Sequence, residues 1–168
     1  MIEFKSSDVM ELSENWFQAY YKETPLITVG NKNSLNTMTI GWGLCGIMWS
    51  KPVALVAVRK ERYTHEFMER NDYFTISFFD SDYQAELMLC GTKSGREVDK
   101  IRETGLHPVY EEDYTYFAEA RLVLICKKIY HADFKEEGFR DAEIIDKRYP
   151  DHSFHTEYYG EIIQVLKK

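Results

Sequence analysis

Four side chains that suit a bound anion follow directly after an apolar stretch of the chain. Residues 53–58 contain no polar side chain, and Arg59, Arg62, Tyr63 and Thr64 come next. A guanidinium group can bind two phosphate oxygens at once, and Thr64 can cap a helix whose free N–H groups also favour an anion. The pattern predicts a phosphate-binding site where a buried strand emerges from its sheet.

The stretch that precedes this strand has the residue types to lie against a flat ligand. Residues 36–43 include two threonines and an isoleucine, which favour an extended chain. Gly41 and Gly43 allow a ring or another backbone to approach closely. A bent barrel strand without any ligand explains the same residues equally well, so both interpretations stay open.

A second cationic loop lies further along the chain. Lys93, Ser94 and Arg96 are close together, and Ser94 forms a capping-box pattern with Glu97. This pattern predicts a helix that ends at Gly105, a residue type that commonly follows the last helical turn. The basic residues either contact the same ligand or are solvated at the start of a capped helix.

Three histidines near the C-terminal end of the sequence raise the question of a metal. His152 and His155 are three residues apart, and His131 precedes them. The pair lies in a proline-containing loop and lacks a carboxylate or cysteine partner at a ligand spacing. We therefore predict no metal centre. No serine elbow, Gly-rich dinucleotide motif or P-loop occurs either.

Composition limits the class of protein. The chain has 168 residues, of which 44% are hydrophobic and 15% aromatic, and its net charge is −7. We expect one domain over 1–168, with residues 1–24 as a peripheral segment, and no nucleic-acid partner. Because no signal-peptide core or membrane-spanning apolar run is present, we expect a cytoplasmic protein without a membrane partner. Three cysteines without a CxxC pair predict buried free thiols.

The expected elements are mainly strands with short helices inserted between them. This order favours an antiparallel or mixed barrel over a doubly wound sheet. Residue types and alternation predict strands at 26–30, 36–43, 53–58, 73–79, 117–131 and 158–166. Helices are expected within 8–21 and at 65–70, 81–89, 94–105 and 141–147.

Several short motifs follow one another in an order that is specific as a set, although each is weak alone. They are Asn36-Thr37-Met38-Thr39-Ile40-Gly41-Trp42, Lys51-Pro52, Arg59-x-x-Arg62-Tyr63-Thr64, Ser94-Gly95-Arg96-Glu97-Val98-Asp99-Lys100 and His155-x-x-Tyr158-Tyr159-Gly160-Glu161-Ile162. From about residue 25 onward the chain resembles the flavin reductase-like family of FMN-binding split barrels, and within it the flavoredoxin-like branch. It departs from that pattern at Gly41, where Ala or Ser is usual, and at Glu97, where Asp is usual.

The resemblance implies a six-stranded Greek-key split barrel that forms a homodimer, with FMN near the subunit interface. It implies that the flavin ring and ribityl chain are lined by Asn36, Met38, Thr39, Ile40, Gly41 and Trp42. It implies that the phosphate is held by Arg59, Arg62, Tyr63 and Thr64, and that the next loop contributes Lys93 and Ser94, from the same or the other subunit. His155 is then a candidate catalytic residue over the open flavin face, with a surface loop histidine as the alternative.

The resemblance further implies an oxidoreductase activity. NADH or NADPH would deliver hydride to the flavin, and electrons would pass on to an acceptor, which includes the possibility of an acceptor protein. A non-enzymatic FMN electron carrier that serves a protein partner is the second hypothesis. A flavin-free barrel that uses the pocket for another phosphate ligand is the third.

Overall fold

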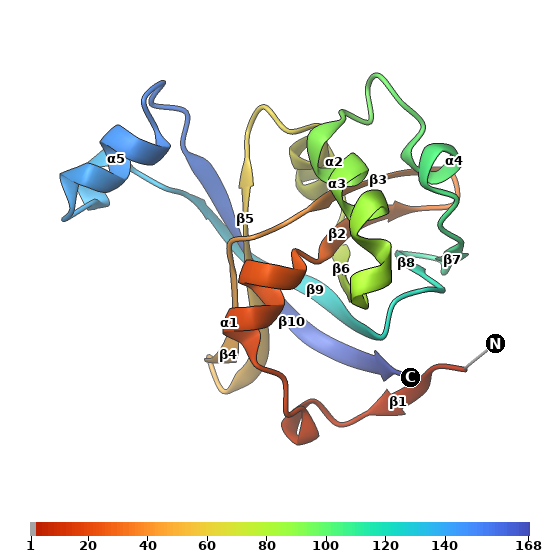
Figure 1. Cartoon of the computed structure of the whole chain (residues 1–168). Coiled ribbons are helices and arrows are strands. Elements are labelled where there is room, and N and C mark those ends of the chain that lie inside the picture. Colours follow the sequence, from red (N-terminus) through yellow and green to blue (C-terminus); the bar gives the residue numbers. More distant parts are fainter. Residues whose placement is uncertain (1–2) are drawn as a thin grey trace.

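The computed structural model describes residues 3–168, and its core is one antiparallel sheet of eight strands. The order is β3-β2-β6-β9-β10-β5-β4, and β1 pairs with β10 (Figure 1). These strands are β1 Lys5–Ser7, β2 Leu26–Asn31, β3 Ser34–Thr39, β4 Gly43–Met48, β5 Lys51–Arg59, β6 Tyr73–Phe78, β9 Leu122–Asp133 and β10 His155–Lys167. A separate hairpin joins β7 Pro108–Tyr110 to β8 Thr115–Phe117.

Short helices fill the connections between strands. The α-helices are α1 Trp16–Gln18, α2 Tyr63–Arg70, α3 Gln84–Thr92, α4 Lys100–Thr104 and α5 Ala142–Arg148. The 3₁₀ and π turns are η1 Val9–Glu11, η2 Ala19–Glu23, η3 Ser81–Tyr83 and η4 Glu136–Gly138. The predicted mainly β fold with inserted helices is therefore confirmed. No helix within residues 3–168 is long and apolar enough to cross a bilayer.

The sheet has two more strands than the six expected. Residues 36–43, predicted as one strand, are the end of β3, a crossing at 40–42 and the start of β4. The other addition is β1, a three-residue strand at the edge of β10. The turn between β4 and β5 places Trp49 and Ser50 at positive φ, which matches a tight hairpin connection.

Strand β10 holds the sheet together, because it pairs with β1, β5 and β9. Its register places His155 opposite Arg59 and Glu161 opposite Val53. A Cβ atom at Gly160 would lie 2.5 Å from the Phe74 ring, so the close packing of β10 on β6 requires glycine at that position.

The core lies on both faces of the sheet. One cluster gathers side chains such as Ile27, Val56 and Phe74 inside the barrel, and a second packs around Leu87 of α3 and Phe117. Within β5, every residue from 53 to 58 is buried except the half-buried Leu55. The all-apolar stretch thus became a covered strand, as its composition predicts.

The predicted strand at 117–131 is wrong as a single element. Residues 118–121 leave the sheet, and the chain forms β8 before them and β9 after them. Glu119 accepts from His107, while Arg121 pairs with Glu14 and Glu23. These partners lie outside the strands, so neither side chain forms a cross-strand pair. The two side chains instead connect residues 118–121, which interrupt the predicted strand, to neighbouring segments of the chain.

Residues 134–154, here called the arm, extend from the barrel between β9 and β10 and carry α5 (Figure 1). Its aromatic side chains pack on one another, with ring centroids 4.8 Å apart for Tyr149 and Phe154 and 5.7 Å apart for Tyr149 and Phe139. Tyr149 is almost fully buried, at 1% exposed. The arm therefore has a small apolar core where it meets the barrel.

Candidate functional site

A cavity of about 320 Å³ lies where β3 ends and β5 meets β10. Residues 38–42 line one side, and residues of β5, α3 and β10, with Arg62 at the start of α2, line the rest. Its lining residues are Met38, Thr39, Ile40, Gly41, Trp42, Ala57, Arg59, Arg62, Gly91 and His155. This first cavity brings together most of the residues that the sequence predicts for a flat ligand.

Backbone hydrogen bonds hold the 40–42 crossing in place. The Ile40 N–H donates to the Pro25 carbonyl at 2.9 Å, and the Ala57 N–H donates to the Trp42 carbonyl at 3.2 Å. The two glycines of this stretch have different reasons to be glycine. A Cβ at Gly43 would lie 2.3 Å from the Tyr20 ring, whereas a Cβ at Gly41 would meet only a backbone oxygen at 3.8 Å. The fold therefore requires Gly43, while Gly41 leaves space in the first cavity.

A second cavity of about 220 Å³ adjoins the first and shares Met38 and Arg62 with it. Basic and hydroxyl side chains dominate its wall. The lining residues are Asn36, Met38, Glu61, Arg62, Tyr63, Thr64, Thr92, Lys93, Ser94, Gly95, Glu97 and Lys100. Of the predicted phosphate residues, Arg62, Tyr63 and Thr64 line this cavity, and Arg59 does not. Lys93 and Ser94, which were predicted to approach the flavin from the next loop, also line it.

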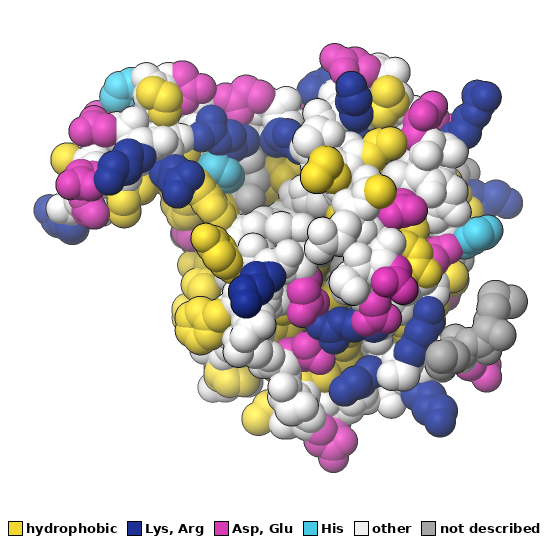
Figure 2. Space-filling view, viewed as in Figure 1, with side chains coloured by type: hydrophobic (Ala, Val, Ile, Leu, Met, Phe, Trp, Pro, Cys, Tyr) yellow, Lys and Arg dark blue, Asp and Glu magenta, His cyan; other side chains and the backbone are white. Residues whose placement is uncertain are grey.

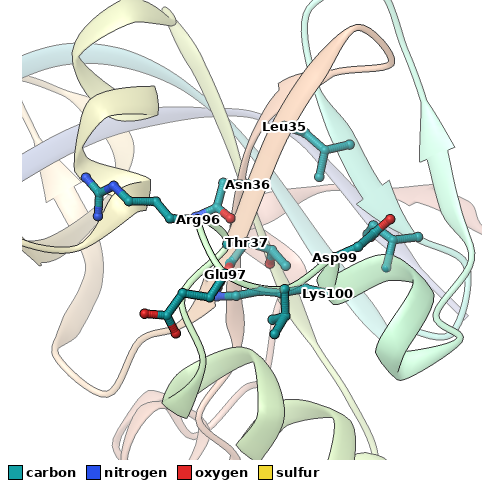
Figure 3. Close-up of a pocket in the computed structure, with 10 residues that line it drawn as sticks. Leu35, Asn36, Thr37, Arg96, Glu97, Asp99 and Lys100 are labelled. Atoms are coloured by element: carbon teal, nitrogen blue, oxygen red, sulfur yellow. Dashed lines mark hydrogen bonds between the residues drawn. The ribbon is translucent and has the colours of Figure 1, made fainter.

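A third hollow of about 450 Å³ lies beside the second and shares Asn36, Gly95, Glu97 and Lys100 with it. Figure 3 shows Asn36 on β3 opposite the loop that carries Glu97 and leads into α4. The hollow is bounded mainly by this loop and the β3 edge. Of its lining residues, the sequence interpretation had named Asn36 and Arg96 as candidate ligand contacts.

Lys100 is a central residue of this region that the sequence interpretation did not select. Its buried ammonium donates to the Thr37 carbonyl at 2.6 Å and to the Cys90 carbonyl at 2.7 Å. Burial, with a smaller contribution from the charge of Arg62, lowers the pKa of Lys100 to about 8. Because this ammonium group is already largely desolvated, an anion can bind to it at little further desolvation cost. Its position in the Ser94–Lys100 motif is the sequence feature that could have identified it as a site residue.

Thr64 does not cap α2, contrary to the prediction. The helix begins at Tyr63, and Arg62 occupies the N-cap position without a side-chain capping bond. The buried Thr64 hydroxyl instead accepts from the Asn36 amide at 2.8 Å. This long-range bond joins α2 to β3, and both residues line the second cavity.

The two arginines are held by different parts of the molecule. The Arg62 guanidinium donates to the Gly91 carbonyl at 2.6 Å and lies between the two cavities. Arg59 donates to the Arg148 carbonyl and lies 3.7 Å from an Asp151 carboxylate oxygen. The structure therefore directs Arg59 toward the arm rather than toward the second cavity.

The predicted helix over 94–105 is shorter than expected. The capping-box residues form a turn in which the Ser94 hydroxyl accepts from the Arg96 N–H at 3.2 Å. The helix α4 starts at Lys100, where the Asp99 carboxylate caps it, and Gly105 follows it at φ 69°, as predicted. The helix predicted at 81–89 is also shifted along the chain. There η3 leads into α3, which continues to Thr92 rather than to residue 89.

His155 begins β10 and is buried, so its placement in a surface loop is wrong. Its Nδ1 lies 2.9 Å from the Tyr149 hydroxyl, and its ring centroid lies 4.7 Å from that of Trp42. Burial and the charge of Arg59 lower the pKa of His155 to about 4, so the imidazole is neutral at ordinary pH. His152, by contrast, is exposed and contacts Glu136.

The remaining reactive groups lie outside the two cavities or are inert. Cys45, Cys90 and Cys126 are all free, as predicted, and Cys90 and Cys126 are buried. Burial raises the pKa of the Cys45 thiol to about 11. Within residues 3–168, no group of three histidine, cysteine or carboxylate side chains is arranged to hold a metal ion.

The fold itself is shared with solved flavoprotein structures. The flavoredoxin of Desulfovibrio vulgaris (Miyazaki F) aligns with 24% identity and a TM-score of 0.67, over 86% of this chain and 68% of that one. An FMN-binding domain of a flavin reductases-like enzyme from Shewanella baltica OS155 aligns with 17% identity and a TM-score of 0.69, over 98% and 77%. The NADH:FAD oxidoreductase SgcE6 of Streptomyces globisporus C-1027, in complex with NAD and FAD fragments, aligns with 18% identity and a TM-score of 0.63, over 86% and 73%. These similarities define the architecture as a flavin reductase-like split barrel.

Residues 18–166 match the model of the flavin reductase like domain family. Because this match covers most of the chain, the protein belongs to that family. Membership supports a flavin-dependent redox function, and the resemblance inferred from the motifs is confirmed.

Proposed function

We propose that the protein is an FMN-binding oxidoreductase that takes hydride from NADH or NADPH and passes electrons to an acceptor. The observation that carries the proposal is the pair of adjoining cavities that share Met38 and Arg62. One is lined by residues 38–42 and by the aromatic rings of Trp42 and His155, and the other is basic and rich in hydroxyl groups. A ring joined to a phosphate by a short chain matches this pairing.

The phosphate is assigned to the second cavity. Arg62, Lys93 and Lys100 bring positive charge to a molecule whose net charge is −7. The hydroxyl groups of Thr64 and Ser94 line the same wall and can donate to phosphate oxygens. Charge-assisted bonds of this kind are stronger than neutral ones, so these residues would supply much of the affinity.

The isoalloxazine ring is assigned to the first cavity. Gly41 leaves space against the backbone wall, and Trp42 and Ile40 offer apolar contact. Bound flavin supplies the hydride-accepting chemistry, and the chain supplies orientation, exclusion of water and backbone polar groups. His155 is neutral and lines the same cavity, so its assigned role is to bind and orient ligands rather than to transfer protons.

A visible spectrum of the purified protein with added FMN tests this proposal. A tight complex that loses its absorbance near about 450 nm when NADH or NADPH is added without oxygen would support the oxidoreductase. A yellow protein that neither nucleotide bleaches would favour the electron carrier instead. A colourless protein that ignores FMN would favour the flavin-free barrel.

A homodimer is the proposed assembly, and the exposed apolar face around β4 supports it. Trp49, at 57% exposed, lies 5.8 Å from both Tyr130 and Tyr159 between ring centroids. Hydrophobic side chains gather on this side of the molecule, below the arm (Figure 2). Other exposed apolar residues of β4, β9 and β10 are Leu44, Ile47, Met48, Ile129 and Ile163. Light scattering of the wild type and of Trp49→Ser tests it, because loss of the ring should favour the monomer.

A further inference from the structure

Besides its contacts with Arg59, the arm reaches the first cavity through the side chain of Tyr149. Tyr149 follows the last residue of α5, and its hydroxyl lies 2.9 Å from Nδ1 of His155. Its ring is fixed by Phe154 and by the Arg59 guanidinium, whose carbon lies 5.4 Å from the ring centroid. This contact is buried, and no role in flavin binding accounts for it.

The chemistry of the two groups sets the direction of the hydrogen bond. A phenol O–H is a better donor than an imidazole N–H, and an imidazole nitrogen is a better acceptor than a phenol oxygen. The neutral His155 ring therefore accepts at Nδ1 and carries its proton at Nε2. Arg59 lies beside the Tyr149 ring and opposite His155 in the strand register, so its charge opposes a second proton on the imidazole.

The other nitrogen of His155 faces accessible space. Nε2 has no hydrogen-bond partner within residues 3–168, and it is not among the buried polar atoms that lack one. The residue lines the first cavity, and its ring lies tilted against that of Trp42, with centroids 4.7 Å apart; Trp42 lines the same cavity. The Nε2–H group is thus available to whatever occupies that space.

We propose that Tyr149 is a positioning residue that fixes His155 in the Nε2–H form and presents one neutral donor to an acceptor atom of the ligand in the first cavity. The identity of that ligand rests on the proposed function, whereas the tautomer does not. The arm is then part of the site. It determines that the cavity offers His155 as an uncharged hydrogen-bond donor.

The charged groups around His155 are consistent with a donor that persists over a wide pH range. Arg59 approaches from β5, Glu61 from the loop that follows it, and Tyr149 from the arm. Asp151 of the arm lies 3.7 Å from Arg59 and offsets part of its charge. Burial and Arg59 outweigh Glu61, so protonation of His155 requires acid, near pH 4.

Nitrogen-15 NMR of histidine-labelled protein without flavin tests the proposal. Two-bond proton–nitrogen correlations distinguish Nδ1–H from Nε2–H imidazoles, and a His155→Gln spectrum assigns the signals. We expect the Nε2–H form in the wild type. In Tyr149→Phe, which keeps the aromatic packing, we expect mixed tautomers and a His155 pKa raised by about one pH unit. Tyr21→Phe, an exposed tyrosine of η2 at 83% exposed, is the matched control and should change neither.

A wild-type spectrum with the proton on Nδ1 would overturn the proposal without any need for a variant. An unchanged tautomer and pKa in Tyr149→Phe would also overturn it. These results do not depend on flavin, so a protein that fails to bind FMN but shows the expected tautomer would reject the proposed function alone. A protein that binds FMN but lacks the expected tautomer would reject only the role of Tyr149.

Discussion

Replacing Arg62 with Ala should weaken FMN binding far more than replacing Arg59. Arg62 lies between the two cavities, whereas Arg59 is held by Arg148 and Asp151 of the arm. A charge-assisted hydrogen bond contributes about 1.5–3 kcal/mol, so the dissociation constant of Arg62→Ala should rise about tenfold to 150-fold. For Arg59→Ala we expect a change of less than about threefold, because Arg59 does not line the second cavity.

Quenching of FMN fluorescence on binding gives both constants, and urea titration checks the fold. Arg62→Ala also loses the bond to the Gly91 carbonyl, which should lower the free energy of unfolding by about 1 kcal/mol. Arg70→Ala, an exposed arginine on the same helix, is the control for loss of charge alone. An Arg62→Ala protein that is folded and binds FMN within about twofold of the wild type would refute the phosphate assignment. A larger loss in Arg59→Ala would move the phosphate to the first cavity.

Three further outcomes are expected. Gly41→Ala should leave both FMN binding and stability near those of the wild type, because its Cβ would meet only a backbone oxygen at 3.8 Å and Ala is usual there in the family that the chain resembles. Gly43→Ala should be destabilised because its Cβ would meet the Tyr20 ring, and paired FMN and urea titrations compare the two variants. Because the pKa of His155 is low in the folded protein, the unfolded chain binds one more proton than the folded chain between about pH 6.5 and 4. The free energy of unfolding should therefore fall by up to about 3 kcal/mol as the pH falls through that window. Urea titrations of His155→Gln should lose this pH dependence. A phosphate beside Lys100 should raise its pKa from about 8, so calorimetry at pH 8 in two buffers should detect proton uptake on FMN binding, and none would place the phosphate elsewhere.

The strands were the most predictable part of the fold. The apolar residues 53–58 could only be stable when covered, and they became the buried centre of β5. The alternating residues 73–79 became β6 with a shift of one residue at its end. The break at 118–121 could not be read from local composition, because it depends on Arg121 reaching Glu14 and Glu23, about a hundred residues earlier.

Helix starts were predicted less well, and the reason is competition for polar side chains. Thr64 has a residue type suited to capping, but the Asn36 amide, 28 residues away, uses its hydroxyl. Ser94 matches a capping box, but its turn leads to Asp99, which caps the helix instead. In both places the local sequence pattern predicts a helix start in the correct region but assigns the capping bond to the wrong side chain.

The grouping of the candidate residues was anticipated from the family resemblance. Most of the residues that the resemblance implies line the two cavities, whereas the structure directs Arg59 toward the arm. Lys100 was missed as a separate contributor, because its burial depends on carbonyl groups of β3 and α3. Tyr149 was missed because its partner His155 was expected in a loop, where the hydroxyl contact would have no fixed geometry.

The position of β10 has a consequence for how the chain folds during synthesis. Strand β10, residues 155–167, lies between β5 and β9 and pairs with both. The ribosome releases it long after β2 and β3. Until then β5 and β9 each present an unpaired edge, which is the kind of surface that recruits other chains. We expect slow acquisition of native structure, with the risk of aggregation concentrated in the interval before that segment emerges.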